Sequence, residues 1–117
     1  MIFTALTPKD SGEIETALLD AFRRCQQAAQ NQEPIVFVLA NEDLLGQNGA
    51  PGAILANALL SGMRTLAAEG HHANAVAVGP DADPEDLQHW IAQLEQGRGV
   101  TGELVHVHAK HVGKLQV

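Results

Sequence analysis

The sequence is poor in aromatic residues, in basic residues and in cysteine. Its 117 residues include three phenylalanines, one tryptophan and no tyrosine, and seven lysines and arginines stand against 14 acidic residues. The basic residues form no cluster, whereas proteins that hold nucleic acid need concentrated Lys and Arg. We therefore expect no nucleic-acid partner. The formal charge of −7 indicates little beyond solubility.

Long apolar runs are also missing. The longest are far shorter than the roughly 20 residues of a membrane helix, so we expect no membrane partner. The start, MIFTALTPKD, has neither the basic beginning nor the apolar stretch of a secretory signal. A lone cysteine, Cys25, has no second cysteine in the chain to pair with, which favours a reducing, cytoplasmic location.

Apolar residues do occur in two alternating patterns along what we interpret as one domain, residues 1–117. Short apolar runs, typical of buried parallel strands, alternate with stretches of helical spacing. This order, β-α-β-α-β-α-β, predicts an α/β, Rossmann-like fold in which right-handed crossovers place helices on both faces of a four-stranded parallel sheet. The strands are expected at residues 2–6, 33–40, 71–79 and 102–109, and the helices at 13–31, 51–69 and 84–96.

Capping signals and apolar stripes support the expected helices. Asp10 and Glu13 are spaced as a capping pair, Pro51 lies near the start of the second helix, and Asp83 and Gly97 bracket the third. Trp90 shares a face with three apolar residues, which is typical of a core or an interface residue. The first helix should bury one stripe: Ile14, Ala17, Leu18, Ala21, Phe22, Cys25 and Ala28.

Three segments carry a family resemblance: MRTLAAEG (63–70), NAVAVGP (74–80) and GVTGELVHVHA (99–109). In this order and spacing they resemble the end of the catalytic helix, the next strand and the last strand of the short-chain dehydrogenase/reductase family. The resemblance covers roughly residues 33–109, which correspond to the C-terminal half of that family. It implies descent from enzymes that use a nicotinamide dinucleotide, here in a truncated form.

The catalytic positions of this family are blank in the sequence. Its members use a tyrosine as general acid/base, a lysine that lowers the pKa of that tyrosine, and a serine that polarises the substrate carbonyl. The resemblance places the tyrosine position at Ala53, the lysine position at Asn57 and the serine position near Ala40, with the helix asparagine near Ala17. It therefore implies that the chain has no catalytic residue of this kind.

The resemblance also implies that no cofactor is bound. The family's glycine loop for the dinucleotide follows its first strand, and nothing before residue 46 has that spacing. Gly46, Gly49 and Gly52 form G-x-x-G-x-x-G, which differs from the dinucleotide fingerprint. We interpret these glycines as shaping a strand-to-helix connection, with a surviving phosphate cradle as the alternative. Carboxylates at Asp81 and Asp83 would repel a dinucleotide phosphate.

Two further features have ordinary interpretations. His106 and His108 point to one face of the last expected strand, with His111 beyond them, and such a set can bind zinc. We interpret them as ordinary strand residues and expect no metal site. Cys25 is expected to be a small core residue, because no histidine or aspartate is spaced to activate it.

Assembly is therefore the first functional hypothesis: a non-catalytic reductase-like protein that forms a homodimer or pairs with a full-length reductase. In the resembled family the two long helices form the subunit interface. The alternatives are an oxidoreductase with a relocated or shared site, and a module that binds a small ligand or an acyl group in the crevice at the strand ends. The expected dimer face is Ala53, Ala56, Leu59, Leu60 and Met63, and the expected crevice is Asn41, Gly46, Gly49, Gly52, Gly79, Asp81 and Asp83.

Overall fold

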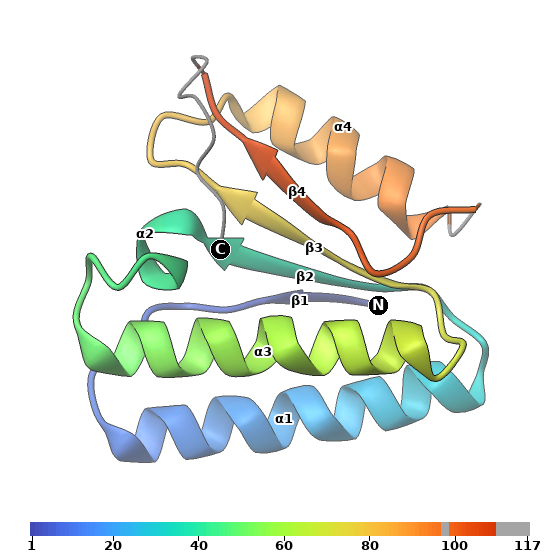
Figure 1. Cartoon of the computed structure of the whole chain (residues 1–117), viewed down its shortest axis with the longest axis horizontal. Helices are drawn as coiled ribbons and strands as arrows, with labels where there is room; N and C mark the ends of the chain where they lie inside the picture. Colours follow the sequence, from blue (N-terminus) through green and yellow to red (C-terminus); the bar gives the residue numbers. More distant parts are fainter. Residues whose placement is uncertain (97–98, 110–117) are drawn as a thin grey trace.

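The computed structural model describes residues 1–96 and 99–109. Its strands lie side by side, all parallel and in sequence order, and its three long helices connect them (Figure 1). The α/β fold predicted from the sequence, a four-stranded parallel sheet with helices on both faces, is confirmed. The elements are β1 (Ile2–Thr4), α1 (Ser11–Gln30), β2 (Ile35–Ala40), α2 (Asn41–Leu44), α3 (Ala50–Ala68), β3 (Ala73–Val78), α4 (Pro84–Glu95) and β4 (Leu104–Val107).

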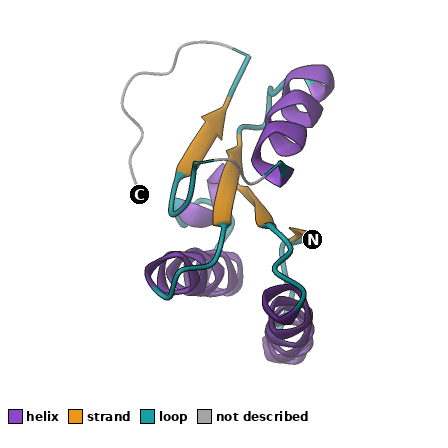
Figure 2. Cartoon of the chain, turned by 90° about the vertical axis from the view of Figure 1, so that its right-hand side faces the viewer, coloured by secondary structure: helices purple, strands orange, loops and turns teal. Residues whose placement is uncertain are grey.

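Both faces of β2 and β3 are apolar, so each face needs a cover (Figure 2). Odd-numbered residues of these strands, such as Phe37 and Ala75, pack against α1 and α3 in the larger core. Even-numbered residues, such as Val36 and Val76, pack against Ile91 of α4 in a second, smaller core. The alternation of side chains along a strand thus explains why helices are required on both sides.

The hand of the last crossover differs from the expectation. Because the strands advance in one direction across the sheet, the hand of each crossover depends on the face on which its helix lies. Helices α1 and α3 share one face and α4 covers the other (Figure 2). About 98% of such connections are right-handed, and we assign that hand to the first two. Because α4 lies on the opposite face, the β3–α4–β4 connection then has the opposite hand and is left-handed. The prediction that all three are right-handed is wrong, and burial of the second apolar face accounts for the exception.

The expected capping residues at the helix starts are confirmed, although α1 begins at Ser11 and α3 at Ala50, slightly before the expected positions. Asp10 caps α1 by accepting a hydrogen bond from the Glu13 backbone at 2.9 Å, and Glu13 accepts one from the Lys9 backbone at 3.2 Å. Asp83 caps α4 by accepting from the Glu85 backbone at 2.8 Å. Pro51 lies in the first turn of α3. The expected stop at Gly97 lies outside the described residues.

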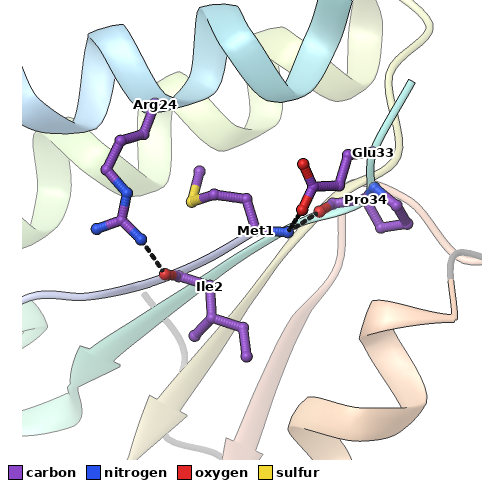
Figure 3. Close-up of polar contacts among 5 residues, drawn as sticks. All are labelled: Met1, Ile2, Arg24, Glu33 and Pro34. Carbon is purple, nitrogen blue, oxygen red and sulfur yellow. Dashed lines mark hydrogen bonds and ion pairs between the residues drawn. The ribbon is translucent and has the colours of Figure 1, made fainter. Parts of the chain in front are cut away.

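Polar contacts with α1 and with the turn before β2 hold strand β1 in place (Figure 3). The Arg24 guanidinium donates a hydrogen bond to the Ile2 carbonyl at 2.7 Å. The Met1 amino group donates to the Pro34 carbonyl at 2.6 Å and pairs with the Glu33 carboxylate at 3.0 Å. The Ile2 carbonyl lies on the outer edge of the sheet, so its hydrogen bond to Arg24 leaves it unavailable to another strand. A charged side chain at this edge also discourages strand pairing.

Two apolar residues that were expected to be buried or in an interface lie at the surface. Phe22 on α1 is 62% exposed, although its neighbours in the stripe, Ala21 and Cys25, are buried. Trp90 on α4 is 44% exposed and packs edge-on against the His89 ring, with centroids 5.4 Å apart. Trp90 is therefore not a core residue.

Candidate functional site

A buried carboxylate closes the crevice at the carboxyl end of β2. Asp43, in the short helix α2, is 3% exposed. Its carboxylate accepts hydrogen bonds from the Thr7 hydroxyl at 2.8 Å and from the Asn48 side-chain amide at 3.1 Å. These contacts join the loop after β1, helix α2 and the loop before α3. The sequence prediction gave residues 41–50 no helix or strand and missed Asp43, although an acidic residue just after a buried strand was a usable signal.

The three glycines of G-x-x-G-x-x-G each have a structural role in this closure. Gly46 and Gly49 have φ angles of 75° and 90°, in the region that favours glycine. Gly52 is buried in the first turn of α3 and lies against Asp43. A Cβ atom at this position would be 2.9 Å from Cγ of Asp43 and still closer to its Oδ1, so a side chain does not fit here. All three glycines thus shape and close the connection from β2 to α3.

The positions that match catalytic roles in the resembled family hold no reactive group. Ala53 and Asn57 are one turn apart on α3, and both are half-buried. The Asn57 amide donates hydrogen bonds to the Ala53 carbonyl at 2.9 Å and to the Leu44 carbonyl at 3.2 Å. Ala40 ends β2 and pairs with Val78 of β3. Asn57 therefore helps to pack α2 on α3, and its donors are already used.

The remaining crevice residues divide into buried and exposed ones. Asn41 and Gly79 directly follow β2 and β3 and are buried at the carboxyl edge of the sheet. A Cβ atom on Gly79 would overlap the His108 ring, so the absence of a side chain lets this ring lie against the end of β3. Asp81 and Asp83 are exposed, and Asp83 is the cap of α4. The predicted crevice residues therefore include two that are covered by the fold, Asn41 and Gly79, and two that face solvent, Asp81 and Asp83.

His106 in β4 and His108 just after it lie on the α3 side of the sheet. The rings of His106 and His108 are nearly parallel, with an interplanar angle of 12° and centroids 6.0 Å apart. Burial, and to a lesser degree the charge of His108, lowers the pKa of His106 below its usual value. His106 is therefore favoured in its neutral form.

The lowered pKa of His106 predicts a loss of stability on mild acidification. Below about pH 6.5 an unfolded chain takes up a proton on this imidazole, while the folded chain resists doing so. The free energy of unfolding should hold its full value above this pH and decline as the pH falls from 7 to 5.5. Urea unfolding at these two pH values should show a smaller decline for His106→Gln than for the parent chain. Equal declines would contradict this assignment.

A groove of about 640 Å³ lies between α1 and α3. Its floor reaches Phe37 of β2, and Phe22 is its largest exposed side chain. The wall on α3 includes the small residues Ala58, Ser61 and Gly62, and a Cβ atom on Gly62 would have no other atom within 4 Å. Other residues that line the groove are Leu18, Cys25, Leu59 and Leu66.

The expected dimer face on α3 needs correction. Four of its residues are packed in the core between α3 and the sheet, with exposures of 4% or less, and the fifth, Ala53, is half-buried. The sheet of the same chain already covers Ala56, Leu60 and Met63, so these three cannot form the surface offered to a second copy. Leu59 is also buried but lines the groove between α1 and α3. The four core residues are Ala56, Leu59, Leu60 and Met63.

Cys25 fits its expected structural role. The side chain is 8% exposed, at the base of the groove, and belongs to the larger core. Burial raises the pKa of its thiol, against the opposing influence of Arg24 and of the chain's amino end. A raised pKa disfavours the nucleophilic thiolate, which agrees with a packing residue.

Comparison of this chain with models of protein families and with curated proteins finds no match. Across residues 1–96 and 99–109, no helix is long and apolar enough to cross a membrane.

Proposed function

We propose that this chain is a non-catalytic relative of the short-chain dehydrogenases/reductases that acts through assembly. Two observations support the non-catalytic part. The positions that would hold tyrosine, lysine and serine are Ala53, Asn57 and Ala40, and the Asn57 amide donors are used in packing. The crevice beside them is closed by the buried Asp43 carboxylate and by Gly52.

The main support for the proposed assembly is the groove between α1 and α3. One surface offers both a projecting apolar side chain, Phe22, and an apolar recess beside Gly62. A two-fold axis brings each projection of one copy opposite the recess of the other, because an isologous interface uses the same patch twice. The proposed partner is therefore a second copy, or the matching helices of a full-length reductase. A reducing, cytoplasmic location belongs to the same proposal.

Phe22→Glu should abolish the dimer. A charge in the centre of an apolar contact is desolvated without a partner, so we expect the dissociation constant to rise at least about 100-fold, equivalent to about 2.7 kcal/mol. Sedimentation velocity between 1 and 100 μM would measure this shift. Trp90→Glu is the matched control, because it also replaces an exposed aromatic residue with a charge, but on the opposite layer. It should leave the dimer unchanged.

The two variants separate the proposed interface from other outcomes. A parent chain that stays monomeric up to 100 μM would remove the homodimer and leave the heteromeric form, which is tested by mixing with full-length reductases of the same cell. A dimer that survives Phe22→Glu but dissociates with Trp90→Glu would move the interface to α4.

A further inference from the structure

Three polar atoms at the carboxyl end of the sheet are buried and have no hydrogen-bond partner among the described residues. They are Oδ1 of Asn41, Nε2 of His106 and Nε2 of His108. Leaving a polar atom buried and unpaired costs about 1–3 kcal/mol, so three such atoms at one edge need an explanation. Neither the closed crevice nor the groove between α1 and α3 uses them.

The topology places the residues that bear these atoms at one edge of the sheet. Asn41 and His108 directly follow β2 and β4, and Gly79 follows β3 between them. Because Gly79 has no side chain, the His108 ring can lie against the end of the middle strand. His106 projects from the same face two residues earlier. Ligands in open α/β sheets characteristically bind at this edge.

We propose that His106 and His108 bind a late first-row divalent metal ion of the zinc type through their Nε2 atoms, with the Asn41 amide oxygen as an additional ligand. Imidazole nitrogen is a preferred ligand of such ions, and two histidines spaced i, i+2 on a strand project to the same side. Both Nε2 atoms make no competing hydrogen bond among the described residues. Metal binding gives all three unpaired atoms a partner.

The ring separation is close to what a shared ion requires. With metal–nitrogen bonds of about 2.0–2.1 Å in tetrahedral geometry, two imidazole centroids on one zinc ion lie about 5 Å apart. The observed separation is 6.0 Å, so the rings must approach by about 1 Å and turn from their nearly parallel orientation. His106 lies in the edge strand β4 and His108 directly follows it, and both side chains are half-buried, which permits that rotation.

The site differs from a structural zinc centre. Within residues 1–96 and 99–109, no group of three or more His, Cys, Asp or Glu side chains is placed to hold a metal ion. Two imidazoles and one amide oxygen leave a coordination position for water or for an external ligand. The metal should therefore exchange, with micromolar affinity, and the chain should fold without it. Neutral histidine is the form that coordinates, so affinity should fall on acidification.

Isothermal titration of the tag-free chain with zinc chloride at pH 7.5 tests the proposal. We expect saturable binding of one ion per chain, and at least about a tenfold weaker affinity in each of His106→Gln and His108→Gln. His89→Gln and Cys25→Ser are the controls and should retain the parent affinity within about twofold, because neither residue belongs to the site. Magnesium chloride should give no saturable heat, because it prefers oxygen ligands.

Side-chain NMR of the histidines in the parent chain gives a second measurement that needs no variant. Zinc should shift the Nε2 resonances of His106 and His108 and leave that of His89 in place. The proposal is overturned by an absence of saturable zinc binding below about 100 μM, or by binding that survives replacement of both histidines. Unchanged Nε2 resonances in the presence of bound zinc overturn it equally, even if one of the variants fails to fold.

Discussion

Gly52→Val should lower the free energy of unfolding by about 3 kcal/mol, because it forces atoms into an already filled, buried position. The added Cβ alone would be 2.9 Å from Cγ of Asp43 and in contact with the methyl group of Thr7 at 3.4 Å. Relief requires that the carboxylate move, which breaks its hydrogen bonds to Thr7 and Asn48. Urea unfolding monitored by circular dichroism measures the loss.

Gly62→Ala on the same helix is the matched control for Gly52→Val when unfolding is measured on the monomer, well below the dissociation constant of the dimer, because Gly62 belongs to the proposed interface. No atom lies within 4 Å of its added methyl group, and the residue is exposed on α3. Alanine in a helix interior is favoured over glycine, so this variant should gain about 0.5–1 kcal/mol. If Gly52→Val proved as stable as the parent chain, the crevice would have room for a ligand, and the claim that it is closed would be wrong.

Met63→Ala should cost about 2–5 kcal/mol of unfolding free energy while leaving the dimer intact. Met63 is fully buried between α3 and the sheet, so its truncation leaves a cavity in the larger core. The proposed interface is on the other side of α3, next to Gly62 and Ala58. Chemical unfolding measures the loss of stability, and sedimentation velocity measures the dissociation constant.

Together, Met63→Ala and Phe22→Glu separate stability from assembly. The first should lower stability and spare the dimer, whereas the second should do the reverse, since Phe22 is already mostly exposed in the single chain. A dimer that dissociates in Met63→Ala while the remaining monomer keeps its stability would mean that Met63 does lie in the interface. The expected face at Ala56, Leu60 and Met63 would then be right.

Local patterns in the sequence predict most of the fold. Short apolar runs and helical spacing identify the strands and the three long helices, and Asp10 and Asp83 mark helix starts because their side chains satisfy free backbone N–H groups. The hand of the last crossover is not encoded in this way. It depends on which of two apolar sheet faces each helix covers, and the one-dimensional pattern does not separate those faces.

The sequence predicts the three glycines of the connection from β2 to α3 but misses Asp43, and its expected dimer face on α3 includes core residues. Helix α3 carries apolar or small residues around much of its circumference, so periodicity alone does not separate the side that meets the sheet from the side that meets solvent. Met63 is buried because the sheet covers its side of α3, whereas Gly62 is exposed because α1 does not cover the neighbouring side. The Asp43 contacts join segments 36 residues apart, and no local pattern reports such a pair.

Native mass spectrometry of the tag-free chain, without and then with NADH or NADPH, tests the central claim most directly. We expect a dimer at micromolar concentration that carries no nucleotide at any excess of either cofactor. The closed crevice and the blank positions Ala40, Ala53 and Asn57 are the reasons for that expectation. A saturable adduct of NADH or NADPH, or a chain that stays monomeric and gains no mass from any reductase, would contradict it.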